Sequence, residues 1–408
     1  MTSLTHFVND GVSMVPLSIF PLLLTIFGLA APELGVVAAM WSITSVIGSP
    51  AIGHLSDRFR RNGALLLAGL AMMAVGVIGT GWSVTAGAIR SLLPLDVYPA
   101  LVFFAAIGGL GSAVAHPVGG AVLSQAYPSS KTGKALGLNG AVGSLGRTLY
   151  PTIVVVLIST LSLPYGVVML GILGLIPAAL IGLFPLEGKR GDTLDAQNTT
   201  EMLERENVAG KSGGLDRSAV RNVIVLTMIG VIRGTFGQGV VAFLSVFIVQ
   251  VQHYSFSFGV GVIMMLAIVL GVPGQIIFGH FSDIHRKASL AVNTAGQSLS
   301  FVFYLYMLSN PIIAVICLAL FGFFTYSSYP VFLSAVSDVV PPRFLSLSNA
   351  IVWGVGILGG NSVGPLIVGL AVGTNLSLLP TIFLTLAIVS GLSTVLVVFL
   401  PRRSRVAY

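Results

Sequence analysis

Charged side chains and cysteine are scarce in this chain of 408 residues. Asp, Glu, Lys and Arg together make up 8% of it, whereas a soluble domain carries about a quarter. So few charges cannot cover a water-exposed surface, and the composition therefore excludes a soluble globular protein. The single cysteine, Cys317, excludes an intrachain disulfide, and it implies no metal cluster. We expect neither a metal nor a cofactor.

Hydrophobic residues are correspondingly abundant, at 55% of the chain. They form runs of about 20 residues, the length that a helix needs to cross the hydrocarbon core of a bilayer. The composition therefore predicts an all-α integral membrane protein with twelve transmembrane helices. The predicted spans are 4–27, 33–55, 63–82, 98–123, 135–160, 164–185, 220–251, 256–280, 288–308, 311–335, 347–372 and 376–400.

The basic residues are distributed unevenly between these spans. Of the twenty Lys and Arg residues, Arg147 and Arg233 fall inside spans and Arg90 lies on one side. The remaining seventeen lie on the other side, which the positive-inside rule assigns to the cytosol. We expect a multi-pass protein of the plasma membrane with both termini cytosolic. The same topology explains the pI near 9.7 without a nucleic-acid partner.

One charged motif occurs twice. Gly-His-Leu-Ser-Asp-Arg-Phe-Arg-Arg-Asn-Gly at 53–63 returns as Gly-His-Phe-Ser-Asp-Ile-His-Arg-Lys-Ala at 279–288, an offset of 226 residues. Span 4 matches span 10 at an offset of 213, and the difference is absorbed by the connection at 83–97. The chain is therefore written as two parallel repeats. We expect two pseudo-symmetric six-helix bundles at 1–185 and 220–408, joined by a cytosolic linker at 186–219.

Ionisable residues inside the predicted spans are rare, and each is a functional candidate because burial in lipid is costly. They are Asp10, Arg147 and Arg233, with His6 and His116 as titratable neighbours. Asp10 lies about 9 Å and His116 about 12 Å from the cytosolic ends of their helices at 1.5 Å per residue.

Two arginines against one aspartate leave this region net positive, which favours an anionic, or partly anionic, substrate. Arg147 as a structural partner of Asp10 is an equally good interpretation. Because an aspartate pKa responds to burial and nearby cations and histidine titrates near neutrality, we expect Asp10 and His116 to carry a coupled proton. The remaining candidate substrate-binding residues are polar side chains on span faces. They are His6, Asn9, Gln238, Tyr326 and Tyr329.

The repeated motif, a glycine followed by Asp-Arg and a basic pair between two spans, resembles the loop signature of the major facilitator superfamily of transporters. The resemblance implies the major facilitator fold, a central cavity lined by spans 1 and 4, and a loop that latches the cytosolic side. We expect the glycines to allow a tight turn and the basic residues to bind carboxylates and lipid headgroups. The predicted gating residues are Gly53, Asp57, Arg58, Arg61, Gly279, Asp283, Arg286 and Lys287.

A narrower resemblance involves His-Phe-Val-Asn-Asp at 6–10 and Gly-Leu-Gly-Ser-Ala at 109–113, which runs on to His116-Pro117. These residues look like the fosmidomycin-resistance-type efflux branch. That branch exports a phosphonate by proton antiport, and the resemblance implies multidrug-type efflux here. The chain departs from the branch at Val118, where an acidic or polar residue is expected.

The leading prediction is therefore a proton-coupled efflux transporter, acting as a monomer by alternating access. Its partners would be a small-molecule substrate, protons and membrane lipid. A proton symporter or uniporter for a carboxylate or sugar is the alternative within transport. A receptor without flux is the alternative of another class. We expect no enzyme, because no Ser/His or metal constellation appears in the sequence.

Overall fold

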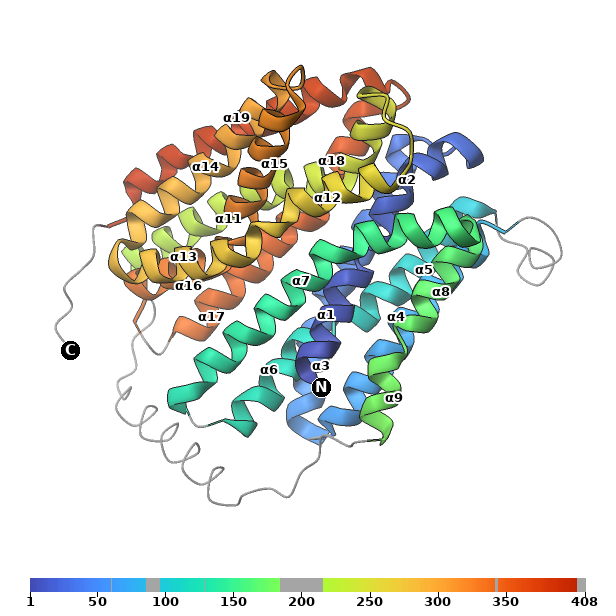
Figure 1. Ribbon diagram of the computed structural model, residues 1–408. Helices are drawn as coiled ribbons and strands as arrows, with labels where there is room; N and C mark the ends of the chain where they lie inside the picture. The colour runs from blue at the N-terminus through green and yellow to red at the C-terminus, as the bar shows by residue number, and fades with distance from the viewer. Residues whose placement is uncertain (60, 86–95, 128, 184–215, 342–343, 402–408) are drawn as a thin grey trace. The chain divides into compact units, whose positions relative to one another are not determined.

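The computed structural model describes residues 1–59, 61–85, 96–127, 129–183, 216–341 and 344–401, and every element in them is a helix (Figure 1). Most of the predicted linker 186–219 lies outside the described residues. The first half contains α1 (Thr2–Val12), α2 (Met14–Phe27), α3 (Ala31–Phe59), α4 (Asn62–Ser83), α5 (Val97–Ser112), α6 (Ala115–Ala126), α7 (Ser129–Leu161), α8 (Leu163–Leu173) and α9 (Ile176–Leu183).

The second half begins with α11 (Arg217–Val246), which ends in the π-helix η1 (Phe247–Val251). The following helices are α12 (Phe258–Val269), α13 (Gly271–Ile284), α14 (Arg286–Tyr306), α15 (Pro311–Tyr326), α16 (Ser328–Val339) and α17 (Leu345–Asn349). The chain continues through the π-helix η3 (Ala350–Leu358), α18 (Gly359–Val372), η4 (Leu376–Leu378), α19 (Leu379–Leu392) and η5 (Ser393–Phe399).

Eleven segments of the described chain are helical, long and apolar enough to cross a membrane. They correspond to eleven of the twelve predicted spans. The remaining predicted span, 288–308, is helical as α14 but too polar to meet the same criteria, because Asn293, Thr294 and Gln297 occupy its buried face. This helix packs against α15 and α19, so its polar face is covered by protein.

Proline explains where several spans divide into two helices. A proline inside a helix lacks the N–H that would bond the carbonyl four residues earlier, and its ring collides with that carbonyl. Accordingly α1 ends at Val12, four residues before Pro16. The same spacing separates the ends of α8, α12 and α15 from Pro177, Pro273 and Pro330.

The described residues form two compact units, which we call unit 1 and unit 2. Unit 1 comprises Met1–Thr200 and Ala242–Met265, and unit 2 comprises Glu201–Val241 and Leu266–Tyr408. In unit 1, α1 packs along α7, α4 along α5 and α8, and α3 along α5. In unit 2, α14 packs along α15, and α13 contacts α15 and α16.

Corresponding helix contacts recur in the two units and match the sequence repeat. In unit 1, a side chain at Gly109 would overlap the backbone of Trp41, so α3 and α5 approach closely there. In unit 2, a side chain at Gly322 would overlap the backbone of Ala267. These positions are related by the offsets of 213 and 226 residues that relate the two halves. The repeat therefore preserves packing as well as residue type.

Candidate substrate and coupling site

The candidate site of unit 1 is built around the Asp10 carboxylate, which α1 carries into the interior. His6 precedes Asp10 by four residues and therefore lies one turn away on the same face of α1. His116 comes from the first turn of α6, and Arg147 comes from α7. We call this group the Asp10 cluster; its members are His6, Asn9, Asp10, His116, Asn139 and Arg147.

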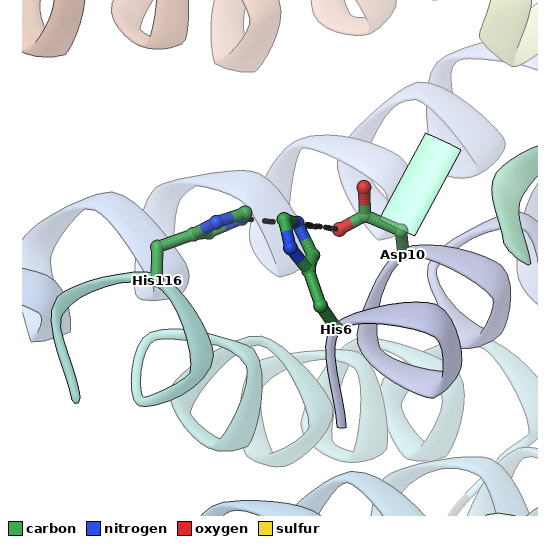
Figure 2. A group of neighbouring side chains, drawn as sticks. All are labelled: His6, Asp10 and His116. Carbon is green, nitrogen blue, oxygen red and sulfur yellow. Dashed lines mark ion pairs between the residues drawn. The ribbon is translucent and has the colours of Figure 1, made fainter. Parts of the chain in front are cut away.

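Both oxygens of the Asp10 carboxylate have partners. Arg147 donates from Nη2 to Oδ2 at 2.5 Å, and Asn9 donates from Nδ2 to Oδ1 at 3.0 Å. The His6 Nε2 atom lies 3.5 Å and the His116 Nε2 atom 3.9 Å from the same Oδ1. Figure 2 shows both imidazoles directed toward this oxygen. The carboxylate therefore faces a fixed cation on one side and two titratable rings on the other.

The two imidazoles also contact each other, and residues of α7 hold the His6 ring in position. Their ring centroids are 4.8 Å apart, with the rings nearly perpendicular. The Nδ1 atom of His6 lies 2.9 Å from Nδ2 of the buried Asn139. Gly143 leaves room for the His6 ring, because a Cβ at that position would lie 2.5 Å from its Cδ2 atom. The sequence of α7 therefore shapes the site through a small residue as well as through polar ones.

Exposure changes sharply across the Asp10 cluster. The Asp10 side chain is 5% exposed and Arg147 is 22% exposed, whereas His116 is 58% exposed. A buried carboxylate thus has an accessible imidazole as its neighbour. Such an arrangement can pass a proton, or admit an ion, between the surface of unit 1 and its interior.

Unit 2 contains a buried cation of a different kind. Arg233 on α11 is 2% exposed, and its Nη2 donates to the carbonyl oxygen of Phe324 at 3.1 Å. Its guanidinium lies 5.9 Å from the centroid of Phe332. The Nε and Nη1 atoms have no hydrogen-bond partner among the described residues, which also provide no carboxylate within ion-pair distance. The acceptor carbonyl lies near the end of α15, where the partial negative charge of a helix terminus favours a cation.

The other predicted substrate-binding residues of unit 2 lie in less unusual surroundings. Tyr329, the repeat counterpart of His116, is half-exposed, and its ring lies 4.8 Å from that of Trp353 in an edge-on arrangement. Gln238 is half-buried on α11, and Tyr326 is the last residue of α15. Their role in binding substrate stays a prediction.

The predicted turn at the repeated motif is wrong in one respect. Gly53 and Gly279 lie inside α3 and α13, and neither has the positive φ that a tight turn would require of glycine. A Cβ at Gly53 would lie 4.0 Å from the ring of Pro117, and one at Gly279 would lie 3.9 Å from Pro330. Both distances are ordinary van der Waals contacts, so neither a turn nor close packing requires glycine at these positions, and the chain reverses a few residues later.

The charged residues of the motif are placed as follows. Arg58 lies in the last turn of α3, its guanidinium 5.5 Å from the Phe59 ring, and Arg61 precedes α4. Asp283 lies in the last turn of α13 and is exposed, whereas the side chain of Asp57 lies outside the described set.

The basic pair of the second motif reaches across unit 2. Arg286 forms an ion pair with Asp338 and donates to Ser337 Oγ at 2.9 Å. Lys287 donates to the carbonyl oxygen of Val398 at 3.0 Å, close to the end of the last helix. Arg286 thus binds a carboxylate, and the gating role of the basic pair stays a prediction. The sequence analysis did not identify Asp338 itself, although an acidic residue just beyond a span is a recognisable signal.

Twelve predicted helical spans, eleven of them recognisable in the structure, and two repeated packing units define a membrane transporter. The chain matches the Major Facilitator Superfamily over residues 2–360 and 271–407, and it belongs to that family. The family resemblance found in the sequence and the predicted fold class are therefore confirmed, and the protein is a multi-pass membrane protein with the fold of secondary transporters that work by alternating access.

Two curated relatives illustrate the range of the similarity. The chain is 23% identical over 365 residues to the MFS-type transporter YfnC of Bacillus subtilis, covering 89% of this chain and 84% of that protein. It is 26% identical over 164 residues to the fosmidomycin resistance protein of Escherichia coli, covering 40% of this chain and 36% of that protein. Among solved structures, the inward-open xylose transporter XylE of E. coli superposes with a TM-score of 0.76 at 15% identity, covering 100% of this chain and 96% of XylE. At that identity the likeness shows the fold alone.

Proposed function

We propose that this protein exports a small anionic or amphipathic organic solute in exchange for protons. The observation that carries the proposal is the Asp10 cluster, in which a buried carboxylate bonded to Arg147 at 2.5 Å has two imidazoles within 4 Å. Charged groups inside membrane spans are costly and rare, and those that are present commonly mark the path of an ion, a proton or a substrate. Asp10 and His116 would carry the proton, because a proton on the carboxylate weakens its attraction to Arg147.

The positive charge of the interior supports an anionic substrate. Asp10 offsets Arg147, but the described residues offer no carboxylate to Arg233. Because an arginine keeps its proton, a buried guanidinium favours an anion nearby. Arg233 and, when released from Asp10, Arg147 would then bind the substrate, and His6, Asn9, Gln238, Tyr326 and Tyr329 would contribute polar contacts.

Export through the plasma membrane, with both termini in the cytosol, is part of the same proposal. It draws on the excess of basic residues on one side of the spans and on the partial similarity to the fosmidomycin resistance protein. The motif loops, with Arg286 bonded to Asp338, would stabilise one access state and contact lipid headgroups. The working unit would be a monomer.

Flux into proteoliposomes tests the proposal directly. The purified chain is reconstituted, and movement of fosmidomycin, an anionic phosphonate, and of D-xylose, a neutral sugar, is followed under imposed pH gradients of either direction. Antiport predicts that fosmidomycin moves against the proton gradient, that Asp10→Asn abolishes this dependence, and that Asp216→Asn, a change outside the spans, leaves it intact. Movement of the solute with the proton gradient would instead establish symport, and gradient-driven flux in Asp10→Asn would refute the assignment of Asp10. No flux of fosmidomycin under any gradient would refute export of this phosphonate by the chain.

A further inference from the structure

The side chains of His6, Asp10 and His116 offer a second chemistry that the proposed proton exchange does not require. One ligand atom from each residue lies within 4.8 Å of the other two. Two imidazole nitrogens and one carboxylate oxygen form a ligand set suited to borderline divalent ions such as Zn²⁺ and Co²⁺, whereas Mg²⁺ and Ca²⁺ prefer oxygen alone. We propose that His6, Asp10 and His116 bind a divalent transition-metal ion of the zinc and cobalt class.

The distances require only a small contraction of the site. The two Nε2 atoms lie 3.5 and 3.9 Å from Asp10 Oδ1. The imidazole nitrogens lie within 4.8 Å of each other, so the point equidistant from all three atoms lies at most about 2.4 Å from each, and Zn–N and Zn–O bonds are about 2.0–2.2 Å long. Rotation of the exposed His116 side chain would shorten its distance to the metal by the few tenths of an ångström required, without moving a helix. In the view of Figure 2 the His6 ring lies between His116 and Asp10, and dashed lines join the imidazoles to the carboxylate oxygen.

The neighbours of these three residues favour a ligand role. Metal-bound histidine usually gives its other ring N–H to an oxygen atom, which holds the ring in position. Asn139 lies 2.9 Å from His6 Nδ1, and its buried Oδ1 atom has no hydrogen-bond partner among the described residues. Rotating the Asn139 amide by half a turn places this oxygen against Nδ1 and leaves the His6 Nε2 lone pair free for a metal. Asn139 is therefore assigned as the positioning residue.

Arg147 limits the affinity of the site. It occupies Asp10 Oδ2 at 2.5 Å, so the carboxylate binds a metal through Oδ1 only, and the guanidinium repels a second cation. Asn9, which donates to Oδ1 at 3.0 Å, shares that oxygen. We therefore expect a dissociation constant in the micromolar range rather than that of a dedicated structural site, which suits an ion that enters and leaves through the exposed His116.

Metal titration of the purified full chain, with any affinity tag removed, tests the site without measuring transport. Zn²⁺ binding is followed by calorimetry, and Co²⁺ binding by its visible absorption, whose intensity reports the coordination number. One ion should bind per chain, and His6→Ala or His116→Ala should weaken it at least tenfold. His54→Ala is the matched control, because His54 is an exposed histidine of α3 outside the Asp10 cluster. The metal affinity of this variant should equal that of the wild type.

His116→Cys in a Cys317→Ser background supplies an independent variant. A thiolate at this position should restore binding and add a thiolate-to-cobalt charge-transfer band, which a merely structural role of His116 would not produce. The inference is overturned if no saturable one-to-one binding occurs, if His6→Ala and His116→Ala bind like the wild type, or if His54→Ala loses binding equally. Loss of proton-linked flux with metal binding intact would refute only the proposed function. Proton-linked flux without metal binding would refute only the metal site.

Discussion

Replacing Arg147 by Gln would remove the cation that lies 2.5 Å from Asp10 Oδ2 and leave the carboxylate in a site where it is 5% exposed. Removing one partner of a buried ion pair costs about 3–5 kcal/mol, because the remaining charge has lost both its water and its partner. We expect the low end of this range, about 3 kcal/mol, because Asn9 still donates to Oδ1 and the Nε2 atoms of His6 and His116 remain within 4 Å of it.

The reciprocal change, Asp10→Asn, should cost less. It leaves Arg147, which is 22% exposed and can reach water with its long side chain. The loss is then closer to that of a charged hydrogen bond, about 1.5–3 kcal/mol. In the double variant both charges are gone and the two amides can bond each other, so it should be more stable than Arg147→Gln alone. A double-mutant cycle of these variants should therefore give a favourable coupling energy of about 2–3 kcal/mol between Arg147 and Asp10.

The measurement is the free energy of unfolding of the full chain in mixed micelles, at neutral pH, for the wild type, both single variants and the double variant. Arg147→Lys is the matched control, because it keeps the positive charge and loses only the planar guanidinium group with its several N–H donors. If the two single effects simply add in the double variant, Arg147 and Asp10 do not stabilise each other. The ion pair would then give no support to a site built on their mutual attraction.

Three smaller predictions concern other parts of the chain. The backbone N–H of Ala219 donates to Asp216 Oδ1 at 2.6 Å and lowers the pKa of this carboxyl, so the cap stabilises the fold at neutral pH. That contribution should disappear as the pH falls below about 4, and Asp216→Asn should flatten this part of the stability profile. Gly109→Ala should lower the unfolding temperature because its Cβ meets neighbouring backbone, whereas Gly119→Ala, with open space around it, should raise it slightly. Arg286→Ala should cost about 1 kcal/mol in the same unfolding assay, because its ion pair is only partly buried.

Much of the fold could be predicted because a helix that crosses a membrane needs a run of about 20 predominantly apolar residues. Eleven of the twelve predicted spans meet that requirement in the structure. The helix α14 departs from it, because the Asn293 amide donates to Phe324 and Ser327 inside unit 2 and so offsets part of the cost of its polar face. Predicting this required knowing its neighbours, which a single sequence does not provide.

The candidate site was predictable to a smaller extent. Helical spacing places His6 beside Asp10, but the approach of His116 and Arg147 depends on how α6 and α7 pack against α1. Asn139 was missed as a site residue because an amide on a polar helix face is common and its value lies in one contact with His6. The grouping of His6, Asp10 and His116 as three possible metal ligands was missed for a different reason. It depends on contact between α1 and α6, and His6 and His116 are 110 positions apart in the sequence.

The repeat also shows how the two units have diverged around one packing scheme. Glycine contacts are kept at corresponding positions. The first and seventh predicted spans match at an offset of 227, through Leu-Ser-Ile-Phe at 17–20 and Leu-Ser-Val-Phe at 244–247, and this offset places Arg233 opposite His6 and Gly237 opposite Asp10. Unit 1 thus places a buried carboxylate beside two imidazoles, whereas unit 2 buries a guanidinium with no carboxylate within ion-pair distance among its described residues. A symmetric pair of sites would treat a proton and an anion alike. Under the proposed function, the Asp10 cluster of unit 1 would carry the proton, and Arg233 of unit 2, together with Arg147 once it is released from Asp10, would attract the anionic solute.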